Sequence, residues 1–268
     1  MSNGNSIGSN NKLNFKTKNE LVDYYRNMYK TIPDYFIEKI QKIITFLRTS
    51  LSEQLEQEYF FAFTGGKDCL AALIIIKLYY FLKQKIDYTV TDKLLLNFFA
   101  NYSMLKLPKN LFKVAYFMNN EDFEEEEDYI INFVKEEDLD IFYVYSDFVK
   151  GLKYLINKYN MSYIIMGTRS TDLKNNNGDI DIYQFLHKST YPYPEFKRVY
   201  PVFHFDLEDV WRIILLSKVK YLDLYNRGYS SIGKVKNSKV NENLMFKNES
   251  LPAWCLNKEY SNTERSYR

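Results

Sequence analysis

Between residues 58 and 166, short apolar runs alternate with longer segments in which apolar residues recur every three or four positions. The short runs predict strands at 58–63, 113–117, 140–145 and 163–166. The longer segments predict helices at 68–82, 123–134 and 148–159. Strands that alternate with helices of this length indicate an α/β fold, in which a parallel sheet carries helices on both faces.

Two further amphipathic helices are expected before the first strand, at 19–30 and 33–55. Residues 1–18 begin with a stretch rich in Ser, Asn and Gly and are expected to form a disordered lead-in. Residues 85–110 show no clear period, so we expect them to be irregular.

The C-terminal part of the chain changes character from Asn175 onward. Asp206 can cap a helix over 207–217, in which Trp211 supplies core packing. The tail at 229–268 has little periodicity, so it is either partly disordered or wrapped around the core.

The charge balance restricts the partners of the chain. Its formal net charge is +2, from 36 Lys and Arg against 34 Asp and Glu, so no extended basic field for bulk nucleic-acid binding is expected. The N-terminus has no signal-peptide pattern, and no apolar run is long enough to span a bilayer. Cys69 and Cys255 suggest no disulfide framework. We therefore expect a cytoplasmic monomer that binds small molecules and neither nucleic acid nor membrane.

The most informative segment is the turn between the first strand and its helix, Thr64-Gly65-Gly66-Lys67-Asp68. Two glycines let the backbone approach a ligand, and the free N–H groups at a helix start favour an anion. Lys67 can reach a phosphate, and Asp68 can hold a metal ion. The segment matches neither the phosphate loop of P-loop enzymes nor the dinucleotide turn. Taken alone, it also fits an ordinary turn punctuated by glycines.

A second candidate segment, 167–172, is a Gly-Thr turn off the fourth strand, followed by Arg169 and Asp172. An arginine can bind phosphate bidentately, although a surface Arg–Asp pair is the alternative for this segment alone. Ligands of such folds bind beyond the carboxyl ends of the strands. The segments 64–68, 118–120 and 167–172 all follow predicted strands, which favours one shared site.

Further motifs follow these segments in a recognisable order. They are Pro194 with Phe196 and Arg198-Val199, Asp209-Val210-Trp211, the run 224–233 with its Tyr-x-x-Gly-Tyr-x-Ser-x-Gly pattern, Pro252-Ala253-Trp254, Glu264-Arg265 and Arg268. With the Gly-Gly-Lys-Asp turn, the set resembles the eukaryotic FAD synthases (FMN adenylyltransferases) of the phosphoadenosine-phosphosulfate-reductase-like fold, over residues 58–268. The resemblance implies a modified Rossmann-like parallel sheet of the adenine nucleotide alpha hydrolase type, with an irregular C-terminal extension.

The resemblance also implies a reaction, in which the phosphate of FMN attacks the α-phosphorus of ATP and gives FAD and pyrophosphate, with Mg²⁺ as the metal. It makes 58–228 the nucleotide-binding catalytic domain, 19–57 a pair of preceding helices, and 229–268 a tail that completes the flavin site. Phe63, Thr64, Gly65, Gly66, Lys67 and Gly167 are assigned to ATP binding. Asp68, Arg265 and Arg268 are assigned catalytic roles, Arg169, Asp172 and Trp254 flavin binding, and Asp68 the metal.

Three positions depart from the family pattern. Ser170 stands where a second arginine is expected, and Leu173 stands where a proline is expected. Thr190 stands where a carboxylate is expected, and the nearby carboxylates are Asp179 and Asp181. These departures put the flavin contacts at those positions in question.

Two other classes of function stay open. The chain can be another enzyme of the superfamily: a sulfonucleotide reductase, for which Cys255 is the candidate nucleophile, or a tRNA-modifying ATP pyrophosphatase, which needs a larger basic surface. It can also be a non-catalytic nucleotide-binding module. His187 and His204 are expected to be structural. Trp254 is expected either to form a wall of the flavin pocket or to pack the tail.

Overall fold

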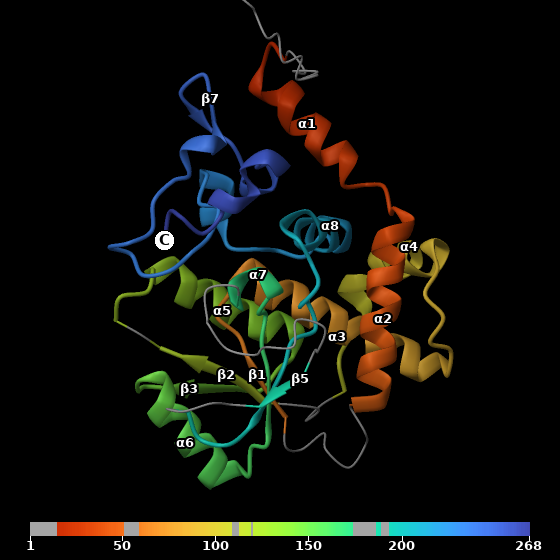
Figure 1. The fold of residues 1–268 in the computed structure, drawn as a ribbon, viewed down its shortest axis with the longest axis vertical. Helices are drawn as coiled ribbons and strands as arrows, with labels where there is room; N and C mark the ends of the chain where they lie inside the picture. The colour runs from red at the N-terminus through yellow and green to blue at the C-terminus, as the bar shows by residue number, and fades with distance from the viewer. Residues whose placement is uncertain (1–14, 51–58, 109–112, 119, 174–185, 189–192) are drawn as a thin grey trace, which may run out of the picture.

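One mixed sheet organises the protein, in a computed structural model that describes residues 15–50, 59–108, 113–118, 120–173, 186–188 and 193–268 (Figure 1). In these residues its strands are β1 (Tyr59–Ala62), β2 (Lys113–Phe117), β3 (Ile141–Val144), β4 (Tyr163–Ile165), β5 (Leu186–Lys188) and β6 (Lys197–Val199). Their order across the sheet is β3-β2-β1-β4-β6-β5. All neighbouring pairs are parallel except β5 with β6, which is antiparallel. The predicted parallel sheet is confirmed, and β5 and β6 are strands that the sequence pattern did not reveal.

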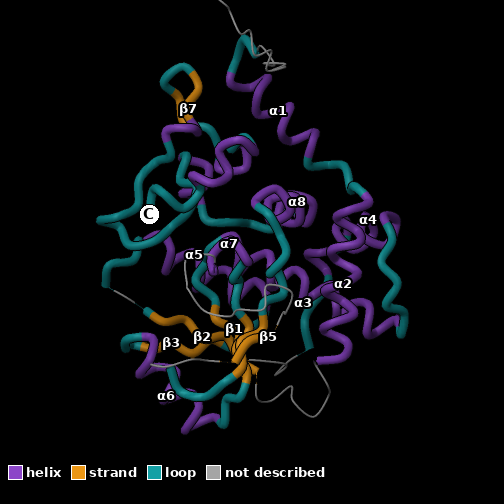
Figure 2. Tube along the Cα trace, in the orientation of Figure 1, coloured by secondary structure: helices purple, strands orange, loops and turns teal. Residues whose placement is uncertain are grey.

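The central strand β1 divides its side chains between two packed layers. Phe60 and Ala62 belong to an apolar cluster that includes Leu152 of α6 (Phe148–Tyr159). Phe61 and Phe63 belong to a larger cluster with α3 (Lys67–Lys85) and α5 (Glu124–Glu137). Successive strand residues face opposite sides, so helices cover both faces of the sheet, as Figure 2 shows.

The helix α3 is apolar on nearly every side because it is enclosed. It packs against α2 (Asp34–Ser50) and α8 (Leu207–Ser217), and it lies in the same cluster as the sheet. Asp206 caps α8 by accepting a hydrogen bond from the Asp209 amide at 2.9 Å, and Trp211 of α8 is fully buried. Both predictions for this segment are confirmed.

The expectation that residues 85–110 are irregular is wrong. The segment forms α4 (Asp92–Ala100) and the 3-10 turn η2 (Tyr102–Met104). Thr91 caps α4 by accepting from the Leu94 amide, and Leu95 and Phe98 are fully buried. The apolar face is only two turns long, which is too short for the period to stand out in the sequence.

The N-terminal helices are found at α1 (Lys18–Met28) and α2, close to the expected ranges. The expected end of the second helix, at residue 55, lies outside the described residues. So do most of the predicted lead-in, residue 119 of the segment 118–120, and the positions Asp179, Asp181 and Thr190.

The C-terminal tail wraps around the core, which resolves the two alternatives for it. It follows the short turn η3 (Asp223–Arg227) and contains the turns η4 (Glu242–Leu244), η5 (Ala253–Cys255) and η6 (Lys258–Thr263), and a hairpin of β7 (Met245–Phe246) and β8 (Glu249–Ser250). Trp254 and Leu256 are buried, and Figure 1 places the end of the chain beside α5 and α7 (Ser170–Leu173). In the part of the chain that the structure describes, no helix is long and apolar enough to cross a membrane.

The end of β4 lies against the start of α3 so closely that only glycine fits between them. A Cβ added to Gly167 would lie 2.3 Å from the backbone nitrogen of Cys69 and 2.4 Å from the carbonyl carbon of Asp68. These are backbone atoms of a helix, so they cannot rotate away as a side chain would. Gly167 therefore sets the distance between two of the segments that were expected to form the site, 64–68 and 167–172.

We predict that Gly167→Ala lowers the free energy of unfolding by about 2–3 kcal/mol, because the added methyl forces α3 away from β4. Chemical denaturation monitored by circular dichroism measures the change. Gly233→Ala is the matched control, since the added Cβ there would lie 3.4 Å from its nearest neighbour, in ordinary contact. An equal loss in both variants would contradict the steric explanation.

Candidate active site

The Gly-Gly turn joins β1 to α3 with a backbone suited to an anion. Gly65 adopts a φ of +71°, and an added Cβ would lie 3.2 Å from side-chain atoms of Tyr129 and Ile130. Gly66 is the N-cap of α3 in extended conformation and offers no side chain to the first amides of the helix. No side chain of the cap residue therefore occupies the N–H groups at the start of this 19-residue helix, where the dipole favours negative charge.

The first residue of α3 is fixed by a tyrosine from the C-terminal part of the chain. The hydroxyl of Tyr225 accepts a hydrogen bond from the Lys67 amide at 3.0 Å, and its ring centre lies 5.7 Å from the Lys67 Nζ. Burial raises the pKa of Tyr225 well above its ordinary value, so the hydroxyl stays protonated. Tyr225 thus links η3 to the turn, a role that the sequence pattern did not settle.

Asp68 is a nearly buried carboxylate that faces three cations. Its Oδ1 lies 2.9 Å from Arg169 Nε, and its Oδ2 lies 3.0 Å from an Arg265 nitrogen and 3.4 Å from Lys67 Nζ. Burial alone would raise the pKa of Asp68, but Arg169, Lys67 and Arg265 hold that pKa well below its usual range. Asp68 therefore stays ionised at every physiological pH.

Arg169 is fully buried just beyond β4. It donates from one terminal nitrogen to both carboxylate oxygens of Glu264, at 2.6 Å each. The same carboxylate lies 2.6 Å from Lys67 Nζ. Burial opposes the charge of the guanidinium, yet Asp68 and Glu264 raise the pKa of Arg169 above its ordinary value. Burial also opposes the charge of Glu264, but Lys67 and Arg169 lower the pKa of that carboxyl.

Asp172 ties the tail to the segment after β4. Its carboxylate accepts from the Arg169 amide at 2.9 Å and from Arg265 at 2.8 Å, and the Arg265 Nε lies 2.5 Å from its other oxygen. Arg268 donates to the hydroxyl of Ser231 at 3.2 Å. Arg265 therefore bridges Asp68 and Asp172, whereas Arg268 holds a second part of the tail.

These ion pairs connect six side chains into one charge cluster: Lys67, Asp68, Arg169, Asp172, Glu264 and Arg265. Its three cations and three carboxylates balance one another. It joins the start of α3, the segment after β4 and the tail. Each of these segments lies about 100 residues further along the sequence than the one before. The structure thus brings together two of the three segments predicted to share a site, 64–68 and 167–172, whereas the charge cluster includes no residue of 118–120.

Three of the other assigned residues contribute differently than expected or lie elsewhere. The ring of Phe63 stacks on Phe133 in the core with centroids 5.0 Å apart, so only its backbone borders the turn. Thr64 lies on the surface, with its hydroxyl 3.6 Å from the sulfur of Cys69. Trp254 donates to the Tyr221 hydroxyl at 3.1 Å, its carbonyl accepts from the Tyr29 hydroxyl, and the guanidinium of Arg26 on α1 lies 5.7 Å from its ring centre. That geometry matches the alternative of tail packing.

Glu264 is the member of the charge cluster to which the sequence assigned no role. The sequence shows only a glutamate beside Arg265 in an aperiodic tail. The one feature of the sequence that could have indicated Glu264 is its position next to Arg265, which was already assigned to the site. A local pattern cannot show which distant cations a carboxylate will meet.

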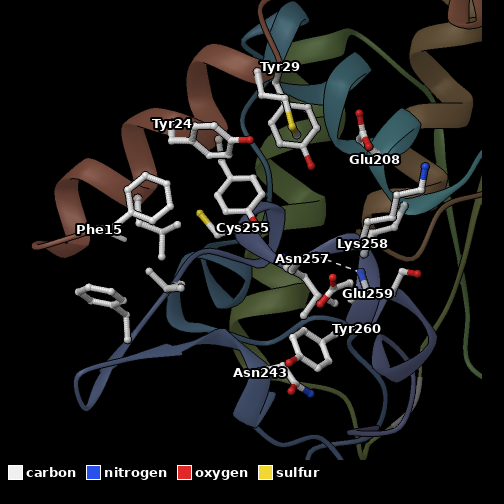
Figure 3. Close-up of a pocket in the computed structure, with 18 of the residues that line it drawn as sticks. Phe15, Tyr24, Tyr29, Glu208, Asn243, Cys255, Asn257, Lys258, Glu259 and Tyr260 are labelled. Carbon is white, nitrogen blue, oxygen red and sulfur yellow. Dashed lines mark hydrogen bonds between the residues drawn. The ribbon is translucent and has the colours of Figure 1, made fainter. Parts of the chain in front are cut away.

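A separate cavity of about 880 Å³ lies between α1, the start of α8 and the tail (Figure 3). Tyr24 lines it from α1, Tyr29 from the residue that follows α1, Glu208 from α8, and Cys255 and Tyr260 from the tail. Its lining includes no member of the charge cluster and no residue assigned to ATP, flavin or metal. This cavity is therefore distinct from the charge cluster.

Glu126, in the first turn of α5, is a buried carboxyl outside the charge cluster. It is 8% exposed, and burial together with the charge of Asp122 raises its pKa from 4.5 to about 8. The native protein therefore keeps this proton over a pH range in which the unfolded chain has released it.

We predict that this titration lowers the free energy of unfolding as pH rises from 4.5 to about 8. The unfolded state binds fewer protons than the native state in that window, so the slope is negative and is at most about 1.4 kcal/mol per pH unit. Denaturation at a series of pH values should show a smaller slope for Glu126→Gln. Glu124→Gln, at an exposed position of the same helix turn, should keep the original slope. The same slope in all three proteins would contradict the prediction.

Two named proteins are similar to this chain over about two thirds of its length or more. The chain is 24% identical over 257 residues to the flavin adenine dinucleotide synthase of Saccharomyces cerevisiae. The aligned region covers 91% of this chain and 76% of that protein. It is 24% identical over 186 residues to the probable FAD synthase of Schizosaccharomyces pombe. That aligned region covers 67% of this chain and 60% of the relative. The chain thus spans less than two thirds of the second relative.

Solved structures show the same fold. The crystal structure of Candida glabrata FMN adenylyltransferase in complex with FMN and the ATP analog AMPCPP superposes with a TM-score of 0.67 at 17% identity, over 94% of this chain and 98% of that chain. Yeast FAD synthetase in complex with FAD gives a TM-score of 0.67 at 18% identity over the same shares.

The sequence model of the phosphoadenosine phosphosulfate reductase domain matches residues 58–240, which is more than half of the chain. The matched region contains the strands β1 to β6, the Gly-Gly turn and Arg169. The chain therefore belongs to the phosphoadenosine phosphosulfate reductase domain family.

Proposed function

We propose that the protein is an FAD synthase, which transfers the AMP part of ATP to the phosphate of FMN. One observation carries the proposal: Arg265 of the tail pairs with both Asp68 and Asp172, so that three segments of the expected site meet in one charge cluster. The relatives named FAD synthase match as much as 91% of the chain. The compounds bound in the similar structures, FMN with an ATP analog and FAD, are the substrates and product of this reaction.

The reaction joins two anions and needs little covalent help from a protein. An oxygen of the FMN phosphate forms a bond to the α-phosphorus of ATP, the bond from that phosphorus to the oxygen bridging to the β-phosphorus breaks, and pyrophosphate leaves with the electron pair. Positioning and charge neutralisation supply most of the rate for transfers of this kind.

In this proposal the Gly-Gly turn holds the phosphates that leave. The amides of Gly65 and Gly66 and the ammonium of Lys67 face the β- and γ-phosphates at the start of α3. Arg169 and Arg265 offset the repulsion between the two substrates, because guanidinium groups bind phosphate bidentately. Arg268 belongs to the same tail and is proposed to act on the flavin side.

Asp68 is proposed to hold Mg²⁺. In the described part of the chain, no group of three or more His, Cys, Asp or Glu has the arrangement of a metal site. Magnesium commonly takes only one or two carboxylates and completes its coordination with water and substrate phosphates, so a single ionised carboxylate at the nucleotide turn fits it. Bound there, Mg²⁺ would neutralise negative charge on the phosphate oxygens.

The buried thiols disfavour a sulfonucleotide reductase. That reaction needs a reactive thiolate, and burial raises the pKa of Cys255 to about 12. Burial likewise raises the pKa of Cys69. Neither thiol ionises readily at neutral pH, so the one alternative that relied on Cys255 loses its nucleophile.

The proposal extends to the organisation of the chain. We assign residues 58–228 to the catalytic domain and 19–57, whose described part holds α1 and α2, to a preceding segment. The tail at 229–268 is proposed to complete the site by supplying Glu264 and Arg265. A cytoplasmic monomer remains our expectation.

We predict that the purified protein, given ATP, FMN and Mg²⁺, forms FAD and pyrophosphate in equal amounts. Chromatography with flavin fluorescence measures FAD, and a coupled phosphate assay measures pyrophosphate. Pyrophosphate released without FAD would support another enzyme of the superfamily, and neither product from folded protein would support a non-catalytic module.

We further predict that Asp68→Asn lowers the turnover number at least about 100-fold, because the charge of the carboxylate is lost from the phosphate site. Asp128→Asn, an exposed position on α5, should keep normal turnover. Circular dichroism establishes that both variants are folded. Near-normal turnover in folded Asp68→Asn would contradict the assigned role.

A further inference from the structure

Glu264 lies in an unusual place for a carboxylate. It is only 4% exposed, and its two oxygens contact Lys67 and Arg169 at 2.6 Å. Its backbone carbonyl accepts from the hydroxyl of Ser230 at 2.7 Å, which holds the tail in this position. The carboxylate therefore sits directly against two cations that are themselves buried.

These two cations are the ones that a phosphate would need. Lys67 follows the Gly-Gly turn, and Arg169 follows β4, so both lie at the carboxyl edge of the sheet. Both are about 1% exposed, and their charged groups already contact Glu264 and Asp68. The donors of a guanidinium match a carboxylate and a phosphate equally well. A phosphate and the Glu264 carboxylate therefore compete for the same groups.

On the basis of the function proposed above, we propose that Glu264 is an internal anion that occupies the phosphate-binding cations of the free protein. A phosphoanion that binds Lys67 and Arg169 displaces the Glu264 carboxylate, and Glu264 thereby sets the affinity of the site for phosphate groups. Without a ligand, the carboxylate is the second anionic partner of two buried cations that would otherwise share only Asp68, and burying an uncompensated charge is costly. Arg265, the next residue, keeps its own pairs with Asp68 and Asp172 and holds the tail near the site.

The size of the effect follows from the competition. The apparent affinity for a ligand is the intrinsic affinity reduced by the fraction of molecules that are competent to bind. If Glu264 occupies the cations in about nine of ten free molecules, it weakens phosphate binding about tenfold. Removing its charge should recover that factor.

The test measures binding of inorganic pyrophosphate alone, by isothermal titration calorimetry without FMN or Mg²⁺. Glu264→Gln keeps the shape and hydrogen-bonding capacity of the side chain but removes the competing charge. We expect its dissociation constant for pyrophosphate to fall about tenfold relative to the unchanged protein. General damage to the site would weaken binding, so the direction of the change separates competition from a structural role.

Glu249→Gln is the matched control. It makes the same chemical change on the tail, at an exposed carboxylate that pairs only at 3.3 Å with Lys18. Its affinity for pyrophosphate should equal that of the unchanged protein. Equal or weaker binding by Glu264→Gln, or a gain of the same size in Glu249→Gln, would overturn the proposal.

A second measurement needs no variant and covers the case in which Glu264→Gln does not fold. In the unchanged protein, saturating pyrophosphate should speed hydrogen exchange of backbone amides in residues 258–268, because the tail loses the Glu264 pairs. Exchange that slows or stays the same would overturn the proposal.

These outcomes are independent of the FAD reaction. A tenfold gain in pyrophosphate affinity in a protein that forms no FAD would support the role of Glu264 and contradict the proposed activity. FAD formation without a tenfold gain in pyrophosphate affinity would support the proposed activity and contradict the role of Glu264.

Discussion

The candidate site depends on a buried carboxylate that must remain charged. Asp68 lies at the first turn of α3, where an ionised group would be costly to bury without partners. Lys67, Arg169 and Arg265 supply that compensation from three different parts of the chain. Breaking any of these pairs leaves a charge in a region of low dielectric, so the start of α3, the segment after β4 and the tail are held together as one unit.

The same requirement explains why an irregular tail is as well packed as the sheet. Its short 3-10 turns bury Trp254 and Leu256, and Ser230 holds the carbonyl of Glu264. This packing places Glu264 and Arg265 among the cations and carboxylates of the sheet edge. The tail is thus part of the site, and its position is fixed by apolar burial and by charge together.

A balanced cluster of cations and carboxylates also suits a site that must accept two anionic substrates. Buried cations without an anionic partner would destabilise the free protein. Cations whose anionic partner could not be displaced would be unable to bind a phosphate. Glu264 provides a partner that is strong enough to stabilise the free protein and similar enough to phosphate to be replaced. Gly167 keeps the two sides of this cluster at the required distance, because a larger residue would push the backbone of Asp68 away.

The sequence by itself determined the helices and strands from β1 to β4 other than α4, and the two glycine-marked turns, because alternating apolar periods and the lack of a side chain are local properties. It therefore predicted the parallel sheet, the site at its carboxyl edge, and the importance of Lys67, Asp68 and Arg169. The helix α4 escaped prediction because its apolar face is short. The pairing of Glu264 with cations almost 100 and 200 residues away was decided only by the tertiary structure. Ion pairs of this kind depend on how the tail packs, and that packing leaves no periodic pattern in the sequence.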